Sequence, residues 1–133
     1  MIRQKFLYVI ISLLFLFSFT RCDDTVTAND IDNRKIPDSN VSFKQHIAPV
    51  FDLKCNSCHG NGKTDAGLNL TNPSFFVDGR IVVPTLPDNS VLVWRIEGRP
   101  PDPIMPPPTY AIPLTVDQVR GVKTWIAEGA KNN

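Results

Sequence analysis

The chain has few of the residues that usually bind a metal ion, with three cysteines and two histidines among 133 residues. A structural zinc site takes four ligands, commonly as two pairs, and no second pair of cysteines follows the first. Charge of one sign is also lacking, because 14 lysines and arginines stand against 13 aspartates and glutamates. This balance offers no basic surface for nucleic acid. A thioredoxin-like redox domain would alternate strands with helices, and the sequence shows no such pattern.

One stretch stands out, Cys55-Asn56-Ser57-Cys58-His59. C-x-x-C-H is the sequence motif of covalent haem attachment. If these residues form one helical turn, the two sulfurs lie on one face and can reach the two vinyl groups of a porphyrin. The imidazole that follows is a good axial ligand, and it is better oriented when its other nitrogen donates to a carbonyl. We therefore expect one covalent haem c; a zinc site and dithiol chemistry are the alternatives.

A proline-rich loop over residues 99–113 is the second informative stretch. Seven of the twelve prolines lie between Pro100 and Pro113, and so many prolines cannot belong to regular helices or strands. Met105 is the only methionine besides Met1, and it precedes three prolines that favour stiff, extended backbone. A soft thioether on such a loop suits haem iron and raises its reduction potential. In a haem domain we expect Met105 to be the second axial ligand; a buried core methionine is the alternative.

Residues 1–21 are typical of an export signal, because two basic residues precede an apolar run over residues 6–19. The run is shorter than the roughly 20 residues that a membrane-spanning helix needs. Cys22 follows directly and resembles the acylated first residue of a bacterial lipoprotein, although Arg21 replaces the small residue usual before it. We expect an exported protein, periplasmic or in the cell envelope, with a lipid anchor on Cys22. An ordinary leader with a leftover thiol is the alternative.

Residues 22–41 are rich in Asp, Asn, Ser and Thr, which predicts a flexible tether without a fold of its own. The domain is expected over residues 42–133, beginning at a capping box that starts with Ser42. An entry helix is predicted from the helical spacing of its apolar residues, and Pro49 should kink or restart it. These residues are Phe43, Ile47, Val50 and Phe51.

Two more helices are predicted. A short middle helix should start near Pro87 and end at Gly98; its inward residues would be Val91, Leu92 and Ile96. Either Trp94 or Arg95 could reach a haem propionate, and an exposed arginine is the alternative. The last helix begins with a capping box at Thr115 and ends near Gly129. It carries an apolar stripe that should pack on the entry helix. The stripe consists of Val116, Val119, Val122, Trp125 and Ile126.

The order of these pieces resembles the small bacterial monohaem cytochrome c domain of class I. The resemblance covers residues 42–130 and depends most on the C-x-x-C-H motif. The other agreeing pieces are Phe43 with Ile47-Ala48-Pro49-Val50-Phe51, Gly67-Leu68-Asn69-Leu70, Val83-Pro84, Ser90-Val91-Leu92, Arg95-Ile96, Met105-Pro106-Pro107, Trp125-Ile126 and Gly129-Ala130. It implies an all-α fold in which the N- and C-terminal helices cross, with a short middle helix and proline-rich loops around a covalent haem.

The resemblance also implies a role for individual residues. Cys55 and Cys58 would form thioethers, His59 would be the proximal ligand and Met105 the distal one. Pro84 is similar to the family proline whose carbonyl accepts a hydrogen bond from the proximal histidine, although a threonine follows it where relatives often carry glycine.

These expectations together describe a one-electron carrier that exchanges electrons with a partner protein and is not an enzyme. The alternative is a five-coordinate haem sensor or weak peroxidase, which needs Met105 off the iron. His46 is a poor substitute ligand, because it lies on the entry helix only 13 positions before His59 in the chain. A zinc-stabilised interaction module is the third possibility.

Overall fold

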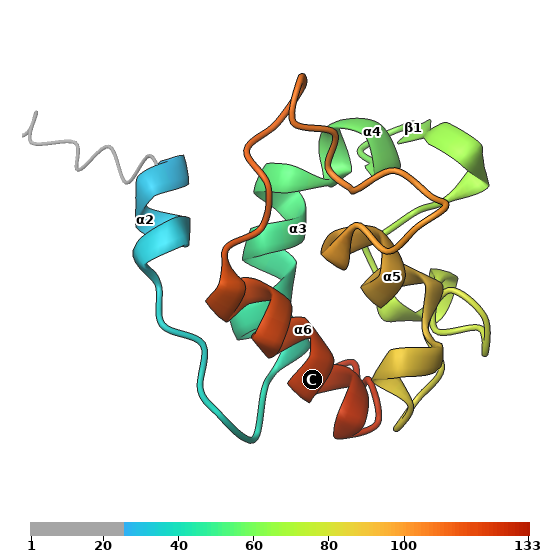
Figure 1. Ribbon diagram of the computed structural model, residues 1–133. Helices are drawn as coiled ribbons and strands as arrows, with labels where there is room; N and C mark the ends of the chain where they lie inside the picture. The colour runs from blue at the N-terminus through green and yellow to red at the C-terminus, as the bar shows by residue number, and fades with distance from the viewer. Residues whose placement is uncertain (1–25) are drawn as a thin grey trace, which may run out of the picture.

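The computed structural model describes residues 26–133, and it confirms an all-α fold (Figure 1). The α-helices are α2 (Ala28–Asn33), α3 (Ala48–Lys54), α4 (Asn56–His59), α5 (Val91–Glu97) and α6 (Val116–Ala127). A π-helical turn precedes α3 (Phe43–Ile47), and single 3-10 turns occur at Asp65–Gly67, Pro73–Phe75 and Pro87–Asn89. The one strand in this part of the chain is the two-residue β1 (Lys63–Thr64). The predicted export signal and Cys22 lie outside the described residues. None of the helices within 26–133 is both long and apolar enough to cross a membrane.

The entry helix is built in two parts. The Ser42 hydroxyl accepts a hydrogen bond from the backbone N–H of Gln45 at 3.2 Å and so caps the π-helical turn. The chain restarts as α3, with Pro49 in its first turn, where a missing N–H costs nothing. Pro49 therefore restarts the helix, as its position in the sequence predicts.

The C-terminal helix α6 packs on this entry helix, as expected. Thr115 and Gln118 form the predicted capping box at its start. Trp125 and Phe43 meet with ring centroids 5.4 Å apart, and Phe51 and Phe76 complete an aromatic cluster. Aromatic pairs of this kind each contribute about 0.5–1.5 kcal/mol beyond their buried area. The cluster closes the domain where the two ends of the chain meet.

The predicted stripe of α6 is wrong at its first residue. Val122, Trp125 and Ile126 are fully buried, and Val119 packs against the core. Val116 is 88% exposed, and the residue that the first turn of α6 buries is Gln118. The helical spacing of the apolar residues did not indicate that Val116 would be exposed.

Helix α5 begins at Val91, later in the chain than the predicted start near Pro87. Residues 87–89 form a 3-10 turn, and Ser90 then becomes the first cap residue of α5. The Ser90 hydroxyl is fully buried; it donates to the Leu86 carbonyl and accepts from the Val83 N–H, and thereby joins the preceding loop to the helix. Gly98 ends the helix in the left-handed region with φ 66°.

The prediction of a tether over residues 22–41 is wrong for the part that the structure describes. Thr27 and Asp30 form a capping box for α2, and Ile31, Ile36 and Val41 are buried in the core. The segment buries only these three apolar side chains, and each of them packs beside α6.

Polar groups of α6 hold the same segment. The Glu128 carboxylate accepts hydrogen bonds from the backbone N–H groups of Asn40 and Val41, at 2.6 and 2.8 Å. Asp117 accepts from the Ile36 N–H at 3.0 Å, and Arg120 donates to the Ile36 carbonyl at 2.7 Å. Because its backbone groups are paired in this way, the segment from Thr27 to Val41 belongs to the folded domain.

Candidate cofactor site

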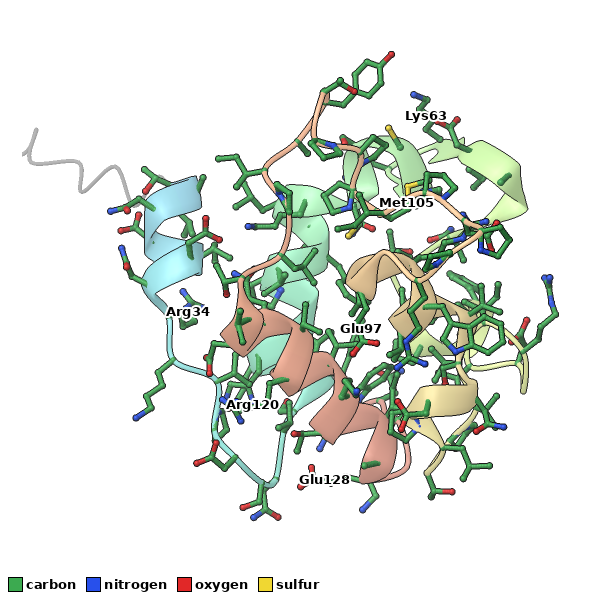
Figure 2. All side chains as sticks on the ribbon, viewed as in Figure 1. Arg34, Lys63, Glu97, Met105, Arg120 and Glu128 are labelled. Atoms are coloured by element: carbon green, nitrogen blue, oxygen red, sulfur yellow. The ribbon has the colours of Figure 1, made fainter. Side chains whose placement is uncertain are left out.

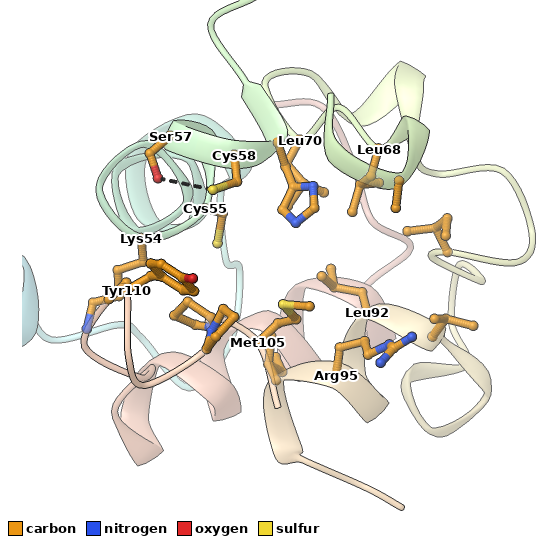
Figure 3. Close-up of a pocket in the computed structure, with 18 of the residues that line it drawn as sticks. Lys54, Cys55, Ser57, Cys58, Leu68, Leu70, Leu92, Arg95, Met105 and Tyr110 are labelled. Atoms are coloured by element: carbon orange, nitrogen blue, oxygen red, sulfur yellow. Dashed lines mark hydrogen bonds between the residues drawn. The ribbon is translucent and has the colours of Figure 1, made fainter. Parts of the chain in front are cut away.

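A cavity of about 280 Å³ opens between the C-x-x-C-H turn, α5 and the proline-rich loop (Figure 3). A cavity of this volume can take a group much larger than one water molecule. Its walls are mainly apolar, as cofactor pockets usually are. The apolar lining includes Leu68, Leu70, Ile81, Leu92, Ile96, Pro106 and Pro107.

A single helical turn carries the two thiols. Helix α3 stops at Cys55, whose φ of −125° is not helical, and α4 begins at once. The Cys55 carbonyl then accepts from the N–H groups of Cys58 and His59, at 3.0 and 2.9 Å. All three side chains line the cavity, and both cysteines are free thiols. Burial raises the pKa of the Cys55 thiol to about 12, although the nearby Lys54 ammonium opposes this rise.

The imidazole of His59 is oriented by the loop that follows it. Its Nδ1 lies 3.1 Å from the carbonyl oxygen of Asp65. With the proton on Nδ1 the ring donates to this carbonyl, and Nε2 keeps a free lone pair for a metal. The backbone of Leu70 donates to the His59 carbonyl at 2.7 Å, which returns the loop to the cavity.

This arrangement differs from the expected role of Pro84. Pro84 is exposed and does not line the cavity, and its carbonyl accepts from the Thr85 hydroxyl at 2.6 Å. Thr85 adopts φ 69°, in the region that glycine would occupy more easily. The carbonyl next to the His59 imidazole therefore comes from Asp65, six residues after the histidine.

Met105 reaches the same cavity from the proline-rich loop (Figure 3). Its backbone N–H donates to the Arg95 carbonyl at 2.8 Å, which fixes the methionine to the end of α5. His46 does not line the cavity; its Nδ1 accepts from the Ser42 N–H at 2.9 Å and so belongs to the helix cap. Two thiols, one imidazole and one thioether thus surround one apolar space.

Two arginines also line the cavity. Arg95 is half-buried, pairs with Asp102 at 3.2 Å and donates to the Pro103 carbonyl at 3.4 Å. Arg80, which the sequence did not single out, is exposed and lines the cavity as well. Trp94 is turned away, because its indole N–H donates to the Asp88 carbonyl at 2.7 Å.

Sequence reasoning missed Lys54, which also lines the cavity. Its side chain is buried and forms an ion pair at 2.6 Å with Asp32, from the segment predicted to be a tether. A lysine directly before Cys55 is ordinarily expected to be exposed, so no signal in the sequence pointed to its burial.

The donor set fits a covalently bound haem. Cys55 and Cys58 would hold it by thioethers, with His59 and Met105 as the two groups able to bind iron. Within residues 26–133, three or more His, Cys, Asp or Glu side chains do not gather in a way that could hold a metal ion.

The family model of the Planctomycete cytochrome C matches residues 55–109. The matched stretch begins at Cys55 and includes His59, α5 and Met105. Neither the curated proteins nor the solved structures contain a match to the chain. The match and the cavity together support a cytochrome c-like domain and, at this coarse level, a haem-based electron carrier.

Proposed function

We propose that the protein is a one-electron carrier with a single covalent haem c and His/Met axial ligation. The observation that supports this is the convergence of Cys55, Cys58, His59 and Met105 on one apolar cavity. Bound haem would supply one-electron redox chemistry at its iron.

The chain's own residues set the conditions for that chemistry. The two cysteines would fix the group covalently, and the Asp65 carbonyl would hold the imidazole with Nε2 toward the metal. The thioether of Met105 is a soft ligand that favours the ferrous state and raises the reduction potential. The apolar walls of the cavity would keep water away from the haem, which also raises the reduction potential. If His59 and Met105 both bind the iron, they would leave it no free site for a substrate.

An optical spectrum of the protein made with a haem-attachment system tests this proposal. We expect a six-coordinate, low-spin spectrum in both oxidation states and slow, weak binding of carbon monoxide to the reduced protein. Rapid, tight binding of carbon monoxide would favour the five-coordinate sensor or weak peroxidase. A colourless protein that holds one zinc ion would establish the zinc-stabilised interaction module.

We also propose that the protein is exported and acylated on Cys22, and that its redox partner is a protein. The support for the anchor is the apolar run at residues 6–19 followed by Cys22. Because the folded chain already starts at α2, the stretch from Cys22 to Ala28 can span at most about 20 Å. An anchor on Cys22 would hold the domain close to the membrane surface. Radiolabelled palmitate incorporated into the parent and lost in Cys22→Ser would support the anchor, and equal labelling of the two would contradict it.

A further inference from the structure

Lys54 is a charged side chain on the wall of a mainly apolar cavity. It is only 4% exposed, and lysines are rarely buried without a partner. Its ammonium lies 2.6 Å from Asp32 Oδ1 and donates to the carbonyl of Pro113 at 3.0 Å. One side chain therefore joins three parts of the molecule: α2, the end of α3 and the end of the proline-rich loop.

Beyond Met105, few other hydrogen bonds hold the proline-rich loop. Prolines have no N–H to donate, and the bonds from Tyr110 and Ala111 to the Pro107 carbonyl stay within the loop. Among the described residues, the bond from Lys54 to Pro113 is the one hydrogen bond that connects residues 106–114 with another element. At the other end, Met105 is bonded to α5. The part of the loop that runs from the thioether to Pro113 is thus hydrogen-bonded to other elements at its two ends.

The carboxylate that pairs with Lys54 is itself held in place. Gln118 of α6 is 1% exposed, and its amide donates to Asp32 Oδ1 at 3.0 Å and to the Ile31 carbonyl at 3.3 Å. Ile31 is buried in the core beside it. Helix α2 is therefore docked on α6 with its carboxylate directed at Lys54, which lines the cavity (Figure 3).

We propose that Asp32 and Lys54 are positioning residues for Met105: the N-terminal helix α2 clamps the end of the proline-rich loop and so keeps the thioether in the haem cavity. This inference rests on the proposed His/Met ligation. The segment before the C-x-x-C-H motif would thus help to keep Met105 on the iron, although it contributes no ligand of its own.

Imidazole binding to the oxidised holoprotein measures how often Met105 leaves the iron, because imidazole can bind only when that position is free. If loss of the clamp raises the open fraction tenfold, imidazole binds about tenfold more tightly. We expect this gain in Lys54→Met and in the milder Asp32→Asn, together with weakening of the sulfur-to-iron charge-transfer band. Hydrogen exchange at the amides of residues 109–114 should become faster in both. Lys54→Arg, which keeps the charge, should stay closer to the parent than Lys54→Met.

Glu128→Gln is the matched control. Glu128 is another carboxylate that docks the N-terminal segment on α6, but it acts at Asn40 and Val41, and Figure 2 shows it at the opposite end of the molecule from Met105. It should lower the thermal midpoint without changing imidazole affinity. Parent-like affinity in both Lys54→Met and Asp32→Asn would overturn the inference, and so would an equal gain in Lys54→Met, Asp32→Asn and Glu128→Gln. Failure of His/Met ligation itself is detected separately, by Met105→Ala binding imidazole no more tightly than the parent.

Discussion

His59 and Asp65 are linked by the short loop that follows the C-x-x-C-H turn: the imidazole Nδ1 lies 3.1 Å from the Asp65 carbonyl oxygen. The loop turns back sharply, since Ala66 and Gly67 adopt φ 55° and φ 74°. The position of this carbonyl therefore depends on two residues in the left-handed region, where a side chain costs about 1–2 kcal/mol.

Gly67→Ala should raise the reduction potential of the holoprotein. The added strain moves the Asp65 carbonyl, and an imidazole that loses this acceptor is a weaker electron donor and stabilises the oxidised iron less well. Gly79→Ala is the control, because Gly79 also has a positive φ, of 80°, with open space around it but no contact with His59. Redox titration of both variants checks this. A potential that changes equally in the two would assign the effect to general strain.

Met105→Ala should keep the haem covalently attached while lowering the reduction potential and opening a coordination site. The cysteines are unchanged, but the soft sulfur ligand is lost. Redox titration and carbon monoxide binding by the reduced protein measure the two effects. If the visible spectrum and the potential equal those of the parent, Met105 is not a ligand.

The stability of the fold should decline in acid partly through Asp32. Burial opposes ionisation of this carboxyl, but hydrogen bonds from Lys54 and Gln118 outweigh burial and hold its pKa below the usual 3.8. A carboxyl with a depressed folded-state pKa stabilises the fold above its unfolded pKa, and this contribution disappears as the pH falls through the folded value. Urea unfolding from about pH 5 down to about pH 2 should show a shallower acid decline in Asp32→Asn than in the parent. Parallel curves would contradict this role.

Gly121→Ala should destabilise the domain, because Ile36 packs directly on this glycine of α6. A Cβ at position 121 would lie 2.6 Å from Ile36 Cγ2, a separation that Cβ atoms in proteins essentially never show. Overpacking of this kind costs about 1–3 kcal/mol. Adding Ile36→Val, which removes no part of the segment's hydrogen bonding, should recover part of the loss. Urea denaturation measures both, and a parent-like Gly121→Ala would mean that residues 34–38 do not dock as described.

The sequence predicted best those features that depend on local spacing. The turn from Cys55 to His59, the helix cap at Ser42 and the capping box at Thr115 are set by residues a few positions apart, and the structure contains all three. Only half of the capping box predicted at Ser42 forms, because the Ser42 N–H donates to His46 Nδ1 instead of to Gln45. Met105 could be singled out because methionine is rare here, and its loop does lead to the cavity.

What the sequence could not show depends on distant partners. The segment around α2 has a polar composition, and its order comes from Gln118, Glu128 and other groups of α6 that lie far away in the chain. The burial of Lys54 requires Asp32 from that same segment. The carbonyl next to His59 was expected at Pro84 by resemblance, whereas the backbone conformation at Ala66, invisible in the sequence, brings Asp65 there.

The most direct test of the central claim is the intact mass of the denatured protein, purified after expression with a haem-attachment system. The parent should retain the mass of one haem after denaturation in acid and organic solvent, and Cys58→Ala should lose most of its haem loading. A parent chain with the mass of the polypeptide alone, or a Cys58→Ala variant loaded as fully as the parent, would contradict a haem held by Cys55 and Cys58.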